Sequence, residues 1–220
     1  MSLNYSTSEE NYLKAIYHLQ EEDGTVTTNV LADRLNTKPA SVTDMMKKLN
    51  GKKLLHYKPY YGFSLSADGR KIALSVIRRH RLWEYFLAEK LKFSWDEVHS
   101  VAEDLEHVSS KKLIDKLDEY LGFPEFDPHG DPIPDNKGKM KSHSRIPLSG
   151  LPENQPGELC QVTNQSQDLL DYLREKNITI GTRMEVRKRN SFDHSLEVKI
   201  RNQSVTLTEQ LAKNLFVKKV

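Results

Sequence analysis

Two short helices with a tight turn between them are predicted by residues 27–49, TTNVLADRLNTKPASVTDMMKKL. Apolar residues recur at helical spacing in both halves, and Val42, Met46 and Leu49 share one face of the second half. Pro39 suits the first position of the second helix, where its missing N–H removes no hydrogen bond. The stretch therefore predicts a helix-turn-helix unit whose second helix is held by its apolar face.

The opposite face of this second helix carries small, hydroxyl and lysine side chains. Small residues let a helix approach base edges closely in the major groove, and lysines neutralise the phosphates beside it. We therefore predict that this face binds DNA through Lys38, Pro39, Ala40, Ser41, Thr43, Asp44, Lys47 and Lys48.

A wing is predicted directly after the two helices. Residues 54–65 have the pattern of two short strands joined by a turn, and Lys58 and Tyr60 near its tip suit contacts to the DNA backbone or minor groove. Residues 25–81 carry twelve Lys and Arg against three acids, as expected for a surface that meets a polyanion. The alternative is a helical scaffold with a basic, solvated face.

The next segment is acidic and rich in histidine. Residues 82–135 carry five Lys against fourteen acids. In residues 95–108, WDEVHSVAEDLEHV, four side chains recur at i, i+4, i+7 and i+8, which places them on one face of a helix: His99, Glu103, Glu106 and His107. One helix earlier, His80 and Glu84 lie four residues apart. Each histidine alone suits an ordinary surface or core position, but the six together predict a cation site.

Imidazole nitrogens and carboxylate oxygens without thiolate favour Mn(II), Fe(II) or Co(II), and Zn(II) can compete. Asp127 and His129, in the sequence DPHG, are a further pair of candidate ligands. Cys160 is the only cysteine, which excludes a thiolate zinc cluster, and we expect it to be a small buried thiol. Seven of the nine prolines lie between residues 124 and 156, which predicts a linker between a helical part and a β-rich part.

The order of these motifs resembles the diphtheria toxin repressor family of metalloregulators, and most of all its manganese-transport-regulator branch. The resemblance implies a mainly α protein with a small β part and three domains. These are a winged helix-turn-helix (1–71), a helical metal-binding and dimerisation domain (72–140), and an SH3-like or FeoA-like β-barrel (141–220). It also implies a homodimer formed through the helical domain, bound to palindromic operator DNA and controlling genes for metal-ion uptake.

The resemblance also groups the ligands into sites. It implies one site from Glu103, Glu106 and His107 with Asn11, and a second from His80, Glu84 and His99. Asp127 and His129 resemble ligands of some members, and Gln161 and Asn164 fall near positions where the β domain of iron-type members reaches its metal. Glu103 indicates manganese. Asn11 departs from the acid usual in manganese-type members, and Lys14 stands where some of them have a second glutamate, which argues against a closely spaced binuclear pair.

We therefore expect a Mn(II)-dependent repressor, with Fe(II) as the alternative metal and Zn(II) or Co(II) as substitutes in vitro. A regulator of the same fold that answers an organic ligand is a second alternative. A metalloenzyme is a third, although the sequence has no HExxH motif, phosphate loop or nucleophile signature. The polar N-terminus and the lack of a long apolar stretch predict a cytoplasmic protein with no membrane partner.

Overall fold

The computed structural model describes residues 5–24, 26–58, 62–108, 110–142 and 144–220. The chain forms two compact units. The first comprises residues 1–80, 105–110 and 134–139, and the second comprises residues 81–104, 111–133 and 140–220. None of the helices in the described ranges is long and apolar enough to cross a membrane.

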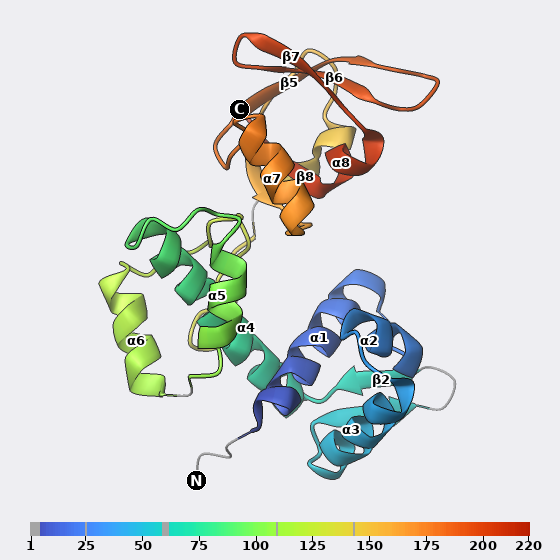
Figure 1. Ribbon diagram of the computed structural model, residues 1–220, viewed down its shortest axis with the longest axis vertical. Helices are drawn as coiled ribbons and strands as arrows, with labels where there is room; N and C mark the ends of the chain where they lie inside the picture. Colours follow the sequence, from blue (N-terminus) through green and yellow to red (C-terminus); the bar gives the residue numbers. More distant parts are fainter. Residues whose placement is uncertain (1–4, 25, 59–61, 109, 143) are drawn as a thin grey trace. The chain divides into compact units, whose positions relative to one another are not determined.

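The first unit contains the predicted helix-turn-helix and wing (Figure 1). Its elements before the long fourth helix are α1 (Thr7–Asp23), α2 (Thr28–Arg34), α3 (Pro39–Gly51), β1 (Leu55–Lys58) and β2 (Gly62–Leu65). Pro39 opens α3 as expected, and the buried face of α3 is formed by Val42, Met46 and Leu49. β1 and β2 pair antiparallel with Leu55 opposite Leu65. The predicted tip residue Tyr60 lies outside the described residues.

A capping box fixes the start of α1. The Ser6 hydroxyl accepts from the Glu9 backbone N–H, and the Glu9 carboxylate accepts from the Ser6 N–H. Glu9 is 1% exposed, yet Lys52 lies 2.6 Å and Lys48 3.2 Å from its Oε1. Burial alone would raise the pKa of Glu9, but these lysines and the Ser6 N–H outweigh it and lower the pKa from 4.5 to about 2.

Glu9→Gln is expected to lower the free energy of unfolding at pH 7 by about 1–2 kcal/mol, a value reduced for the partial exposure of both lysines. Because the folded pKa lies below the unfolded one, the contribution is complete above pH 4.5 and is lost as pH falls towards about 2. Urea titrations of both proteins at several pH values measure it. Glu22→Gln, in an exposed pair with Arg34, is the control and should change little. A difference that persists unchanged at the acid end would contradict this electrostatic origin.

α4 (Ala67–Glu89) begins in the first unit and continues into the second. The other helices before the β domain are α5 (Val98–Leu105) and α6 (Lys111–Tyr120). In the second unit, Leu82 of α4 packs with Ile114 and Leu117 of α6 and with Leu121, which directly follows α6. Ile133 joins this apolar cluster. Burial of these side chains holds α6 against the later turns of α4.

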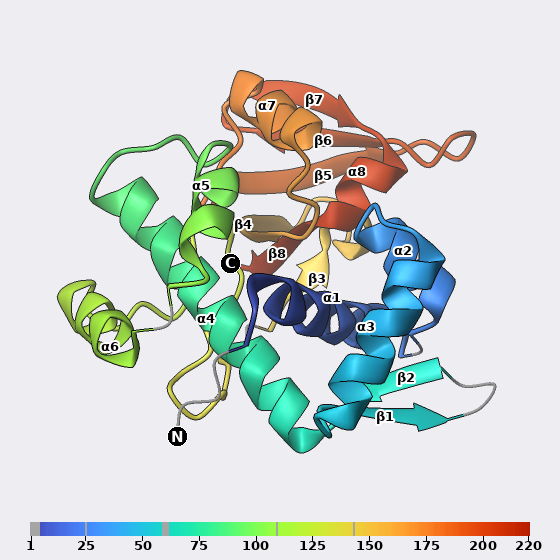
Figure 2. The same cartoon turned by 60° about the horizontal axis from the view of Figure 1, so that its bottom comes forward.

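The C-terminal part of the second unit is a six-stranded antiparallel sheet with two further helices. The strands follow the order β3-β8-β4-β5-β6-β7 (Figure 2). Their bounds, with the helices, are β3 (Ile146–Pro147), the 3-10 turn η1 (Leu148–Gly150), β4 (Pro156–Val162), α7 (Gln167–Glu175), β5 (Arg183–Arg189), β6 (Leu196–Ile200), β7 (Gln203–Leu207), α8 (Glu209–Asn214) and β8 (Leu215–Lys219). Leu196, Val198 and Ile200 are buried and alternate with exposed residues along β6, so this strand turns one face to the core.

The proline-rich segment is more than a linker. Asp127, His129 and Ile133 within it are buried. Asp127 organises the loop, since its Oδ1 accepts from the backbone N–H groups of His129 at 2.8 Å and Asp131 at 2.9 Å. The segment therefore contributes an ordered loop to the interior of the second unit.

Candidate metal centre

The helix that carries the His/Glu motif is shorter than the sequence predicts. α5 ends at Leu105, so Glu106 and His107 lie in the turn that follows, and the prediction of one helical face for all four side chains is wrong. Arg79 of α4 donates from Nε to the Glu106 backbone carbonyl at 2.5 Å. This bond satisfies a carbonyl at the helix end, where intrahelical partners are missing. A residue 27 positions away therefore helps to set where the helix stops.

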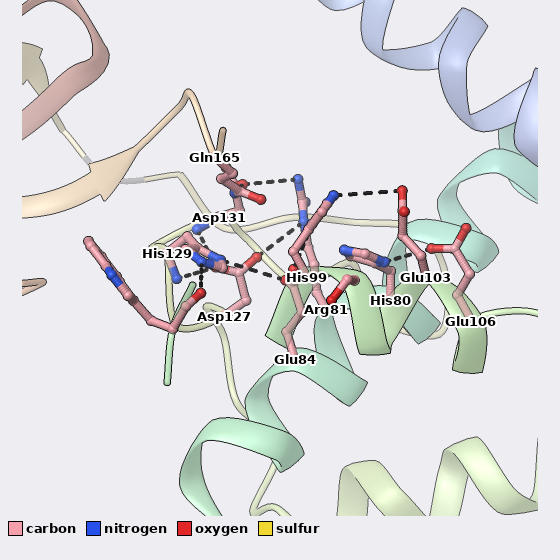
Figure 3. Close-up of polar contacts among 12 residues, drawn as sticks. His80, Arg81, Glu84, His99, Glu103, Glu106, Asp127, His129, Asp131 and Gln165 are labelled. Atoms are coloured by element: carbon pink, nitrogen blue, oxygen red, sulfur yellow. Dashed lines mark hydrogen bonds and ion pairs between the residues drawn. The ribbon is translucent and has the colours of Figure 1, made fainter. Parts of the chain in front are cut away.

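Glu106 is buried among cationic and imidazole groups of the first unit. Its side chain is 1% exposed, and Lys14 Nζ lies 2.9 Å from Oε1 and 2.7 Å from Oε2. His80 Nδ1 lies 2.6 Å from Oε2 (Figure 3). Burial would raise the pKa of Glu106, but the bond to His80 and the charge of Lys14 lower it. The carboxylate is thus held in its ionised form, as a metal ligand must be.

Glu10 is a partner that the sequence interpretation missed. Its Oε2 lies 2.6 Å from His107 Nδ1, and its Oε1 accepts from Arg79 at 2.8 Å. Asn11, the residue predicted to reach the metal, is half-buried beside it on α1. The spacing along α1 could have identified Glu10 as an inward-facing residue, because it lies three and seven residues before the buried Leu13 and Tyr17 and shares their helix face.

Glu103 and His99 lie in the second unit. The Glu103 side chain is 55% exposed, and its Oε1 is 3.6 Å from His99 Nε2. His99 Nδ1 is 3.1 Å from Oε1 of Glu84, which is 1% exposed. His80 precedes Glu84 by one turn on the continuous helix α4, so the two share a helix face as predicted.

A compact ligand cluster is formed by Glu84, Asp127 and His129, all in the second unit (Figure 3). One ligand atom from each lies within 4.8 Å of the others, and their exposures are 1%, 5% and 0%. In the described part of the chain, no cluster of three such atoms includes Glu103, Glu106 or His107. Asp127 and His129, the weaker pair at the level of sequence, therefore belong to the most enclosed set of ligand atoms.

The hydrogen bonds of this cluster leave lone pairs for a cation. His129 Nε2 donates to the Trp95 carbonyl at 2.8 Å, so in the neutral imidazole Nδ1 carries the lone pair. Nδ1 lies 3.9 Å from Glu84 Oε2, too far for a hydrogen bond. Among the described residues, His129 Nδ1 and Asp127 Oδ2 are buried with no hydrogen-bond partner. Buried acceptors that lack hydrogen bonds are costly, and a divalent cation would bind to both.

The local charge also fits a cation. Burial raises the pKa of Asp127 well above its usual value, and the nearby carboxylates of Asp131 and Glu84 raise it further. Burial would lower the pKa of His129, but Glu84 and Asp127 outweigh it and raise the pKa to about 9. Arg81 supplies a permanent positive charge, with its Nε 3.5 Å from Asp127 Oδ2. Without a metal ion, protons on Asp127 and His129 therefore offset the carboxylate charge, and a divalent cation would take the place of those protons.

The loop that carries His129 is fastened to strand β4. The Val162 N–H donates to the His129 carbonyl at 2.9 Å, and Gln161 Nε2 donates to Asp131 at 2.5 Å. Gln165 donates to the same carboxylate at 2.8 Å, whereas Asn164, the position indicated by the resemblance, is exposed. Gln161 Oε1 is buried and has no hydrogen-bond partner among the described residues. The β domain thus positions the ligand loop.

The outer face of α3 lies outside the core, as the DNA-binding hypothesis requires. All eight residues predicted to contact DNA through this face are exposed: Lys38, Pro39, Ala40, Ser41, Thr43, Asp44, Lys47 and Lys48. A cavity of about 490 Å³ opens between α3 and the wing and is lined in part by Thr43, Lys47 and Asn50. The predicted DNA-binding side chains are therefore accessible to a partner.

Three family profiles match successive parts of the chain. Residues 4–63 match the N-terminal DNA-binding domain of iron-dependent repressors, and residues 66–135 match their metal-binding and dimerisation domain. Residues 146–219 match the FeoA domain. The fold class predicted from the sequence is confirmed, with a DNA-binding domain, a helical dimerisation domain and a FeoA-like β domain.

Individual proteins agree with these profiles. The iron-dependent repressor IdeR of Mycobacterium leprae is 29% identical over 96% of both chains. The regulator MntR of Oceanobacillus iheyensis is 34% identical over 53% of this chain and 78% of its own. A solved structure of a manganese-dependent transcriptional repressor in complex with manganese has a TM-score of 0.87 and 32% identity, covering 96% of this chain and all of that one. These are transcriptional regulators, two of them named as repressors, which decides against the metalloenzyme. The chain belongs to the diphtheria toxin repressor family of metal-dependent transcriptional repressors.

Proposed function

We propose that this repressor responds to Mn(II), acts in the cytoplasm and binds a palindromic operator that controls metal-ion uptake genes. The observation that carries the choice of metal is the buried cluster of Glu84, Asp127 and His129, with two ligand atoms lacking hydrogen bonds. Carboxylate oxygens and one imidazole suit Mn(II) better than a thiolate-containing set would. Fe(II) is the second candidate, because relatives such as IdeR are named iron-dependent. Zn(II) and Co(II) should substitute in vitro.

We assign the ligands to three groups. Glu84, Asp127 and His129 form the enclosed group, and His80 and His99 join Glu84 in a second group that shares this carboxylate. The third group consists of Glu106 and His107. The family resemblance adds Glu103 and Asn11 to this group. A bound Mn(II) would supply positive charge to the carboxylates and tie together elements that lie far apart in the sequence.

DNA binding is assigned to the outer face of α3 and to the wing. The small side chains of Ala40, Ser41 and Thr43 allow close approach to base edges, and Lys47 and Lys48 pair with phosphates. The remaining proposed contacts come from the start of α3 and the wing: Lys38, Pro39, Asp44, Lys58 and Tyr60. Two such surfaces in a homodimer would match the two halves of a palindrome.

In this proposal, operator binding depends on metal because the metal shifts the population of the protein between two conformations. The metal favours the conformation in which it has most ligands, and it can change operator affinity only by its differential affinity for the two states. By thermodynamic reciprocity, operator DNA must tighten metal binding by the same factor. A coupling of this kind changes operator affinity by about 5- to 150-fold.

Operator affinity should therefore rise by about 5- to 150-fold when Mn(II) is added to chelator-treated protein. Fluorescence anisotropy with the operator, at fixed ionic strength, measures it for Mn(II), anaerobic Fe(II), Zn(II) and Co(II). Random DNA of equal length is the control, because phosphate contacts alone give salt-dependent but metal-independent affinity. Equal operator affinity with and without every metal would show the proposal to be wrong, and a response to Fe(II) alone would favour the second candidate.

A further inference from the structure

We propose that Lys14 is a tethered cation that occupies the Glu106 carboxylate in the metal-free protein and thereby lowers the metal affinity of the Glu106–His107 group. Its Nζ contacts both carboxylate oxygens, at 2.9 and 2.7 Å, from α1 of the same unit. Because both contacts are within hydrogen-bond distance, the ammonium holds the place from which a cation would bind both oxygens. The inference rests on the proposed ligand role of Glu106 and His107.

The charges around this group are already balanced without a metal. The two buried carboxylates, Glu10 and Glu106, face two permanent cations, Arg79 and Lys14. His80 Nδ1 lies 2.6 Å from Glu106, and His107 lies between the two carboxylates, with Nδ1 2.6 Å from Glu10 and Nε2 3.5 Å from Glu106. A divalent ion placed on Glu106 would therefore add two positive charges to a neutral interior, and the ammonium beside it would repel the ion.

Lys14 is the cation that can leave. Its side chain is 18% exposed and has a flexible four-carbon stem that can carry the ammonium into solvent. Arg79 is 9% exposed, bonds to Glu10 and also holds the Glu106 backbone carbonyl, so its displacement would break the turn. Metal binding at this group is therefore an exchange of the Lys14 ammonium for the ion. Because the Lys14 ammonium must first be displaced, a higher metal concentration is needed to fill the Glu106–His107 group.

The exchange is tested by Mn(II) titration of the full-length dimer, with free Mn(II) followed by its EPR signal. Lys14→Met keeps the stem and removes the charge, and it should lower the dissociation constant of one ion by about 10- to 100-fold, the range found for groups that tune a metal ligand. Lys14→Arg keeps the charge and should bind like the unmodified protein. Lys52→Met is the matched control, because Lys52 lies 2.6 Å from the buried Glu9, outside the proposed ligand groups, and should leave Mn(II) affinity unchanged.

An unchanged or weaker Mn(II) affinity in Lys14→Met, with the metal-free melting temperature preserved, would overturn the proposal. If Lys14→Met does not fold, Lys14→Gln decides in the same way, since its amide is neutral and can still donate to Glu106. Glu106→Gln and His107→Ala separate this inference from the proposed function. If both lose one bound ion while Lys14→Met has no effect, only the role of Lys14 is wrong. If neither loses an ion, the ligand assignment itself fails.

Discussion

Glu84→Gln is expected to abolish the metal response while leaving the metal-free fold intact. One Glu84 oxygen faces His99 at 3.1 Å and the other faces His129 at 3.9 Å, so the substitution removes a charged ligand from two groups at once. Since partners of metal ligands alone account for about 10- to 100-fold in metal affinity, loss of this ligand should cost at least about 100-fold. Operator affinity in Mn(II) should then fall to its metal-free level.

The stability of this variant distinguishes a metal ligand from a structural residue. Removing the charge of Glu84 relieves its repulsion with Asp127 but also removes its attraction to His129, so the metal-free protein should change little in stability. Calorimetric titration with Mn(II) and thermal unfolding in chelator measure the two effects. Glu89→Gln, at the exposed end of the same helix, is the control and should alter neither. A destabilised Glu84→Gln protein that still responds to Mn(II) would mean that Glu84 has a packing role only.

Gly130→Ala should have the second large effect, because it forces the ligand loop away from β4. Gly130 has φ +84°, which strains any L side chain, and an added Cβ would lie 1.9 Å from the Cys160 carbonyl oxygen. The backbone of β4 cannot yield without breaking the sheet, so the loop must move. Such a shift would break the bond between Val162 and His129 and displace the imidazole from Glu84. We expect a loss of about 3 kcal/mol or more in unfolding free energy, from strain and clash together.

Gly181→Ala separates the clash from the backbone strain. Gly181 has φ +86°, and an added Cβ there would meet no atom within 4 Å. This control should lose only about 1–2 kcal/mol and keep its Mn(II) affinity. Urea unfolding and Mn(II) titration of both variants make the comparison. Equal losses in the two variants would show that contact with β4 is unimportant for the loop.

Much of the fold is local in origin, and for this reason the sequence predicted it. Pro39 opens α3, the spacing of Val42, Met46 and Leu49 sets its buried face, and the alternation in β6 identifies a strand with one face in the core. The end of α5 could not be predicted in this way. It depends partly on the Arg79 side chain, which meets the Glu106 carbonyl only after α4 and the turn come together.

The candidate site was predicted by residue type but not by grouping. Helical spacing placed Glu103 in one group with Glu106 and His107. In the structure the helix ends at Leu105, between them, and Glu103 is exposed. Glu10 and Lys14 were not recognised as contacts of His107 and Glu106, because pairs separated by more than 90 residues leave no trace in local periodicity. The enclosure of Asp127 and His129 likewise depends on docking of their loop against β4, which only the tertiary fold reveals.

The donor atoms of the enclosed cluster are all oxygen or nitrogen, and this bears on oxidative stress. Peroxides convert thiolate ligands to sulfenic and higher acids, whereas carboxylates and imidazole are far less easily attacked. The one thiol of the chain, Cys160, is buried in β4 and donates to the Phe216 carbonyl, and burial raises its pKa, so little reactive thiolate forms. The cluster therefore offers peroxide no thiolate ligand to oxidise, and a manganese sensor of this composition would keep reporting metal supply where a thiolate-ligated sensor would lose its ligand.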